Sequence, residues 1–169
     1  SNFAQNFTLD TRIMENTVTQ IRLAIKQIIK NLFPTAQVFA WNALSHNINE
    51  WAGMFRTEDE KTHGWIIKRA ALQGKRKNAQ RDKKTIPYDV WGFYKFDSGA
   101  NVNENNNSDN QFGEIVDSIY EAVKDAHNLD LPGTVEFHDL IQFPSITTLK
   151  SGEETLHFAQ GRLVVHLCC

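Results

Sequence analysis

Cysteine is nearly absent from this chain of 169 residues, and its two copies, Cys168 and Cys169, are adjacent. Neighbouring cysteines cannot join distant loops or supply a four-ligand zinc site, so we expect free thiols. No apolar run is long enough to span a bilayer, and no charged-then-apolar leader opens the sequence. These absences favour a protein of a reducing compartment that makes no membrane contact.

Short catalytic and cofactor-binding motifs are also missing. The chain contains no GxxxxGK[ST] phosphate loop and no GxGxxG, GxSxG or HExxH pattern. Its six histidines have no metal spacing with a cysteine, which favours surface or half-buried structural roles. A metal-dependent nuclease using the charged residues 58–63 is an alternative, although consecutive acids in a loop point in different directions. We expect a non-enzymatic protein that uses no cofactor and no metal.

The residues that are present describe one α+β domain. Hydrophobic residues make up 41% of the chain and charged residues 22%, which is enough to bury a core. We interpret residues 1–10 as an extended N-terminal arm, and 11–169 as the domain. A helix is expected from Asp10 or Thr11 until Pro34 forbids it, because apolar residues recur there every three or four positions. These are Val18, Ile21, Ile25, Ile28 and Leu32.

The remaining pattern predicts the order α-β-β-β-α-β-β, with a mainly antiparallel or mixed sheet packed by two helices on one face. A second amphipathic helix is expected to begin with a capping box at Ser108 and Gln111 and to end near Asn128. The expected strands cover 36–41, 65–73, 86–96, 134–143, with an irregularity near Asp139, and 156–169. Long loops are expected at 42–62, 74–85 and 97–110.

Charge is distributed unevenly along a chain whose formal net charge is only -2. Residues 74–85 carry +5, which leaves -7 for the rest. We expect this basic tip of a hairpin to contact an acidic protein surface or nucleic acid phosphates, with a solvated loop as the alternative. The contact candidates are Lys75, Arg76, Lys77, Arg81, Lys83 and Lys84.

The two expected helices differ in charge, which favours a contact between subunits. The first has a basic row and the second an acidic row, and a neighbour's basic helix could meet the acidic one in a head-to-tail ring. The acids could instead form an ordinary solvated face. The interface candidates are Arg22, Lys26, Lys30, Glu114, Asp117, Glu121 and Asp125, together with Phe3 and Phe7 of the arm.

The layout resembles the tail terminator, or tail completion, proteins of long-tailed bacteriophages. A helix ends in an LFP step at 32–34 and leads into a short VFAW strand at 38–41. A hairpin follows whose second strand carries PYDV at 87–90, and the chain closes on the alternating apolar segment 163–167. The resemblance covers about residues 11–167, and loops 42–62, 74–85 and 97–110 depart from it.

The resemblance implies a virion protein at the head-tail junction, made in the host cytoplasm. Such proteins form a ring, expected to be a hexamer, that caps the tail tube and meets the head-side connector or neck protein, while DNA passes through its centre. The family supplies no catalytic residues. Another neck or head-completion protein, or a nucleic-acid-binding module using residues 74–85, stays open as an alternative.

Overall fold

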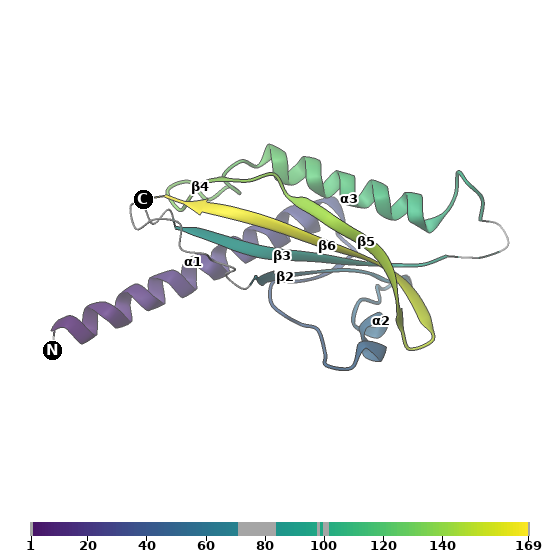
Figure 1. Ribbon diagram of the computed structural model, residues 1–169, viewed down its shortest axis with the longest axis horizontal. Coiled ribbons are helices and arrows are strands. Elements are labelled where there is room, and N and C mark those ends of the chain that lie inside the picture. The colour runs from purple at the N-terminus through teal and green to yellow at the C-terminus, as the bar shows by residue number, and fades with distance from the viewer. Residues whose placement is uncertain (1, 71–83, 98, 100–101, 169) are drawn as a thin grey trace.

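The computed structural model describes residues 2–70, 84–97, 99 and 102–168, with the side chains of 2–15 outside the description. Figure 1 shows long twisted strands with α3 beside them and α1 crossing them. The described elements are α1 (Asn2–Leu32), β1 (Gln37–Phe39), the 3-10 helix η1 (Ile48–Glu50), α2 (Trp51–Met54), β2 (His63–Arg69), β3 (Thr85–Lys95), α3 (Ser108–Asp125), β4 (Val135–His138), β5 (Gln142–Ser151) and β6 (Glu154–Leu167).

The strands form one mixed sheet in the order β1-β2-β3-β6-β4, and β5 also pairs with β6. Only the β1–β2 pair is parallel, and every other pair among the described strands is antiparallel. Strand β6 is long enough to pair with β5 along its first part and with β4 near its end. This confirms the α+β class and the single mixed sheet expected from the sequence.

Helices α1 and α3 pack on one face of the sheet, as the sequence predicts. Their apolar rows meet a fully buried layer of strand side chains that includes Trp65, Tyr88 and Leu163. The helix α1 contacts β1 and β2, while α3 contacts β3, β6 and α1. The two helices therefore cover different halves of the same face, with α1 nearer the β1 edge.

The expected N-terminal arm at 1–10 is wrong, because α1 is already helical from Asn2. Asp10 could cap a helix only if the chain before it left the helical conformation. Residues 2–9 contain neither glycine nor proline, so nothing forces that departure. Phe3 and Phe7, the proposed contacts of the arm, have side chains outside the described part of the structure.

The N-cap of α3 lies one residue earlier than expected, so the helix begins at Ser108 itself. Asn107, rather than Ser108, is the N-cap, and its side-chain oxygen accepts a hydrogen bond from the Asn110 N–H at 2.8 Å. Ser108 is instead buried, where its hydroxyl oxygen accepts from the Asp97 N–H at 2.9 Å and lies 2.8 Å from His157 Nε2. Ser108 thereby ties the start of α3 to the sheet.

The loop expected at 42–62 is an ordered cover for the opposite face of the sheet. It contains η1 and α2, and it buries Phe55 against Phe93 with ring centroids 4.6 Å apart. Together with Ala52, Ile66 and Leu156 these rings form a second apolar cluster. The possible helical turn in this loop is confirmed, and the cover leaves the other end of the face open.

The strand expected at 134–143 is two strands, and the irregularity expected near Asp139 is the break between them. The chain leaves the sheet after His138 and re-enters at Gln142, where β5 begins and continues to Ser151. Register shifts occur within both the β4–β6 and β5–β6 pairs, so the alternation of apolar residues is interrupted. Strand β5 was not predicted, because it contains Pro144 and two threonines and because its mostly exposed residues give no alternation of apolar and polar positions.

Candidate subunit interface

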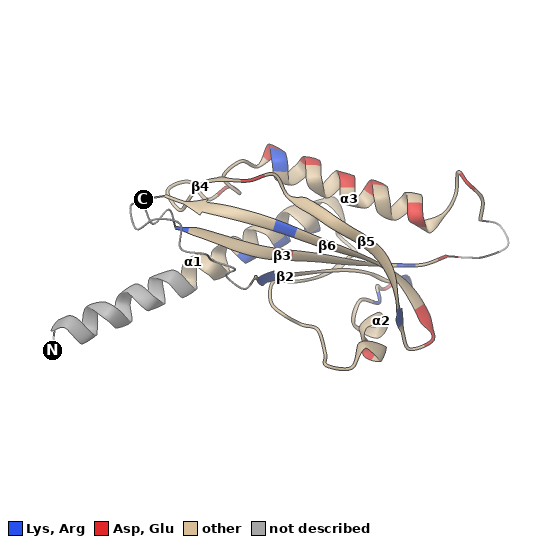
Figure 2. Ribbon diagram, viewed as in Figure 1, with Lys and Arg blue, Asp and Glu red and all other residues tan. Residues whose placement is uncertain are grey.

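The outer side of α3 carries the acidic row predicted from the sequence. Its spacing places four carboxylates opposite the apolar row that packs on the sheet. Figure 2 shows these acids along the side of α3 that faces away from the strands. Lys124 lies near one of them, with 3.6 Å between its Nζ and Glu121 Oε2. The exposed acids are Glu114, Asp117, Glu121 and Asp125.

The basic row of α1 lies on the flank that faces away from α3. The opposite flank, which includes Leu23, Gln27 and Asn31, lines a hollow of about 470 Å³ with Leu129 and Leu131, which follow α3. Lys30 marks the other flank, because its Nζ donates to the carbonyls of Pro34 and Ala36 at 2.8 Å, just before β1. The basic flank therefore lies on the side of the β1 edge.

The three cations of this flank are not equally available to a partner. Lys30 satisfies carbonyls of its own chain at the negative end of α1. Arg22 donates to Thr19 Oγ1 over 3.4 Å, while its Nε is buried and has no hydrogen-bond partner among the described residues. Lys26 is half-exposed and is the residue of this row best placed to reach another molecule.

The two outer edges of the sheet were not predicted as contact surfaces. Strand β5 pairs on one side only, with β6, and β1 pairs only with β2 within the described part of the chain. A large apolar side chain is exposed at each edge: Ile146 of β5 at 46% and Trp41, just after β1, at 57%. Unpaired strand edges with exposed apolar side chains are places where another chain can add.

Charged and aromatic side chains occupy the open half of the face opposite the helices. Lys68 Nζ lies 3.9 Å from the centroid of a Trp91 ring, and Arg162 Nη2 lies 3.4 Å from Asp89 Oδ1. Beside them is a hollow of about 310 Å³ between β3, β5 and β6. The cations are already matched by the ring and the carboxylate, so this face offers little net charge to a partner.

Most of the predicted basic tip lies outside the described residues. This applies to Lys75, Arg76, Lys77, Arg81 and Lys83. Lys84 is described and exposed, just before β3, and its carbonyl accepts from the Leu167 N–H at 2.9 Å. Arg69, also exposed, ends β2 on the other side of the segment.

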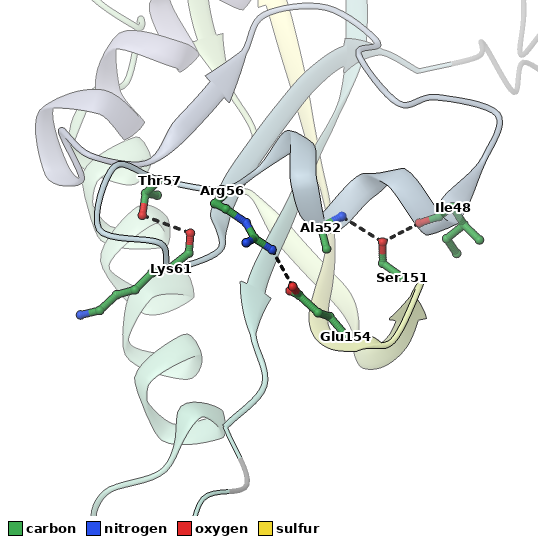
Figure 3. Close-up of polar contacts among 7 residues, drawn as sticks. All are labelled: Ile48, Ala52, Arg56, Thr57, Lys61, Ser151 and Glu154. Carbon is green, nitrogen blue, oxygen red and sulfur yellow. Dashed lines mark hydrogen bonds and ion pairs between the residues drawn. The ribbon is translucent and has the colours of Figure 1, made fainter.

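The β5–β6 turn is joined to the 42–62 cover by a polar bridge. Figure 3 shows Ser151 between α2 and η1: its hydroxyl accepts from the Ala52 N–H at 2.9 Å and donates to the Ile48 carbonyl at 2.6 Å. An ion pair of 2.6 Å between Arg56 Nη2 and Glu154 Oε1 lies beside it. The bridge fixes the position of the β5 edge relative to the cover.

Replacing Ser151 with alanine is expected to lower the free energy of unfolding by about 1–3 kcal/mol. Ser151 is 2% exposed, so the loss of its hydroxyl leaves the buried Ala52 N–H without its partner, while the Ile48 carbonyl keeps only its hydrogen bond from the Trp51 N–H. Urea unfolding followed by fluorescence measures the loss. Arg56→Ala is the comparison, and it should change stability by less than about 1 kcal/mol because its ion pair is exposed. Equal losses would contradict this explanation.

Two histidines are buried rather than placed at the surface. Burial lowers the pKa of His63 to about 4, and its Nε2 accepts a hydrogen bond of 2.9 Å from Trp65 Nε1. Burial also lowers the pKa of His157, partly opposed by the carboxylate of Asp109. Both are packed against aromatic rings inside the fold.

The proposed alternative of a metal nuclease receives no geometric support from these residues. Glu58, Asp59 and Glu60 are exposed around a tight turn, in which Glu60 has φ of +60°, while His63 is buried beneath. Among the described residues, no group of three or more histidine, cysteine, aspartate or glutamate side chains could hold a metal ion.

Comparisons with known proteins add no relative to this picture. A scan of protein-family models and a search of curated proteins both found no match to the chain. Within the described residues, no helix combines the length and the apolar character needed to cross a membrane. The inferences that follow therefore rest on the molecule's own surfaces.

Proposed function

We propose that this protein is a structural subunit of a ring that resembles the bacteriophage tail terminator. In this proposal the ring caps the tail tube, meets the head-side connector or neck protein and lets DNA pass through its centre. The subunit acts by assembly rather than by catalysis. Its place would be the head-tail junction of the virion, and a hexamer is the expected form.

The observation that supports this proposal is the separation of unlike surfaces on one subunit. The α1 flank nearest the β1 edge is basic, and the exposed side of α3, which packs over the other half of the sheet, is acidic. A closed ring of identical subunits needs two different surfaces that complement each other, whereas a two-fold dimer uses one surface twice. Opposite charges also favour contact between the unlike surfaces of neighbouring subunits and disfavour contact between like surfaces.

Mass measurement in solution tests the proposal, followed by electron microscopy with purified tail tubes. We expect a closed oligomer, and rings seated on the end of the tube. A protein that stays monomeric at about 100 μM and leaves the tubes uncapped would contradict it. Dissociation by salt is a second expected result, because exposed charges separated by more than about 10 Å are screened at 0.1 M salt.

A second candidate, a nucleic-acid-binding module, is favoured by the cations around residues 74–85. Lys68 and Arg69 lie at the end of β2 before the segment, and Lys84, within the segment, directly precedes β3. Neutralising Lys75, Arg76, Lys77 and Arg81 together should abolish salt-dependent DNA binding. A basic segment lining a DNA channel would satisfy both candidates, so tube capping, rather than DNA binding, separates them.

A further inference from the structure

We propose that the free edge of β5 in one copy pairs with the free edge of β1 in the next copy, joining their sheets. This inference rests on the proposed ring and names the contact that holds it together. The partner of the β5 edge is therefore a second copy of this chain, which contributes its β1 strand. The exposed acids of α3 then come near the basic flank of the next subunit's α1.

The backbone of β5 is ready to accept such a strand. Ser151 pairs with Glu154 across a two-residue turn, so pairs of residues alternate from there between facing β6 and facing outward. The Thr155 carbonyl accepts from the Phe96 N–H on the far side, so Thr155 and its partner Lys150 direct their backbone groups away from each other. Counting back by two, Thr148 and Ile146 also present their backbone groups to the outer edge.

The middle of β5 lacks the features that usually protect an edge. Pro144 and the register shift oppose pairing with another strand at the beginning of β5, and Lys150 opposes it at the end. Between them, Ile146, Thr147 and Thr148 are exposed, β-branched and uncharged. Such a stretch favours pairing with another strand over remaining in water.

The topology makes the β1 edge a suitable partner. Strand β5 runs antiparallel to β6, and β1 runs parallel to β2, which is antiparallel to β3. In a ring whose axis follows the strands, β1 of the next copy therefore lies antiparallel to β5. Trp41, the most exposed large apolar side chain in the described part, then lies at the contact, where tryptophan contributes strongly.

Charge complementarity selects this pairing over pairing of β5 with a second β5. On the helix-bearing face, α1 covers the β1 side and α3 covers the β3 and β6 side. Joining β5 to the next β1 brings α3 next to the neighbour's α1, whose outward flank carries Lys26. A two-fold pair of β5 edges instead brings two acidic α3 helices together, which like charges oppose.

Cysteine mixing tests the contact directly. In a background with Cys168 and Cys169 replaced by serine, one chain carries Thr147→Cys and another Gln37→Cys. Both side chains project from the sheet face that α2 covers, because Thr147 is opposite Phe158 and Gln37 is two residues from Phe39. Mild oxidation of the mixture should give a disulfide-linked pair containing one chain of each kind.

The control is Thr148→Cys, which projects from the other face and should not cross-link to Gln37→Cys. A disulfide formed by Thr147→Cys alone would show β5–β5 pairing and would overturn the inference. Oligomers that form without the mixed disulfide would also overturn it, while leaving the proposed ring intact. A strictly monomeric protein would overturn both.

A second variant blocks the edge without a cross-link. Thr148→Pro removes an N–H that faces outward, so the β6 pairing keeps its own hydrogen bonds. We expect the concentration for half-assembly to rise about tenfold or more, with the circular dichroism spectrum unchanged. Unchanged assembly by the folded variant would overturn the inference, and the cysteine experiment decides the matter if the variant does not fold.

Discussion

Gly92→Ala is expected to lower the free energy of unfolding by about 3 kcal/mol or more. A Cβ at this position in β3 would lie 2.4 Å from Cη2 of Trp65 and 2.6 Å from two further atoms of its ring. Overpacked cores typically lose 1–3 kcal/mol, with larger losses where the surroundings cannot move. The contact between the added Cβ and Trp65 is one in which the surroundings cannot move, so the larger loss is expected.

Trp65 cannot move aside because its ring is held on several sides. It is fully buried, its Nε1 donates to His63 at 2.9 Å, and its ring lies about 6 Å from the rings of Phe112 and Phe143. Any displacement would disturb the packing of α3 and β5 together with the hydrogen bond. The strain is therefore expected to appear as lost stability rather than as a small local adjustment.

Gly113→Ala is the matched control, since no atom lies within 4 Å of its added Cβ and it is in the interior of α3. Alanine there should raise stability by about 0.5–1 kcal/mol. Urea unfolding at neutral pH measures both variants. The double variant Gly92→Ala with Trp65→Leu should lose less stability than the sum of the two single losses, because the smaller side chain removes the clash. Equal effects of the two glycine variants would contradict the steric explanation.

The helices were predictable because their apolar spacing is a local property of the sequence. The rows of α1 and α3 follow three- and four-residue steps, and most of each row is buried; at the end of α1, however, Ile29 is buried, Ile28 is half-buried and Leu32 is 38% exposed. The start of α1 was missed because Asp10 looked like a cap, although no residue before it stops the helix. Strand β5 was missed because its exposed edge has no apolar alternation to detect.

The candidate interface was predictable in its charges but not in its geometry. The spacing of Lys26 and of the acids on α3 follows from the sequence alone. That the basic flank lies on the β1 side, while β5 leaves an open edge, depends on how distant elements pack. The close approach of Gly92 to Trp65 has the same origin, since nothing near either residue in the sequence identifies the other.

Acidification is expected to destabilise the fold between pH 6.5 and about 4 through His63. Its pKa is lowered from 6.5 to about 4 by burial, so in this window the unfolded chain binds a proton that the folded chain does not. The free energy of unfolding therefore falls as the pH falls. A shift of this size corresponds to about 3 kcal/mol, lost fully once the pH reaches the pKa of the folded protein.

The geometry around His63 explains why protonation and folding conflict. Its Nε2 is the acceptor for Trp65 Nε1, and a proton on Nε2 would turn this hydrogen bond into a contact between two donors. Burial leaves the charged ring without water. Because Trp65 also packs against α3 through Phe112, loss of this contact is expected to loosen the helix layer together with the sheet.

Urea unfolding at several pH values between 7.5 and 4.5 tests this prediction with His63→Gln. Glutamine keeps an acceptor for Trp65 but cannot titrate, so the variant should be somewhat less stable at pH 7.5 and lose less stability on acidification. His127→Gln, which removes an exposed histidine, should retain the pH dependence of the unchanged protein. The same steep loss in His63→Gln would assign the acid sensitivity to other groups, of which His157 is the first to test, because burial lowers its pKa as well.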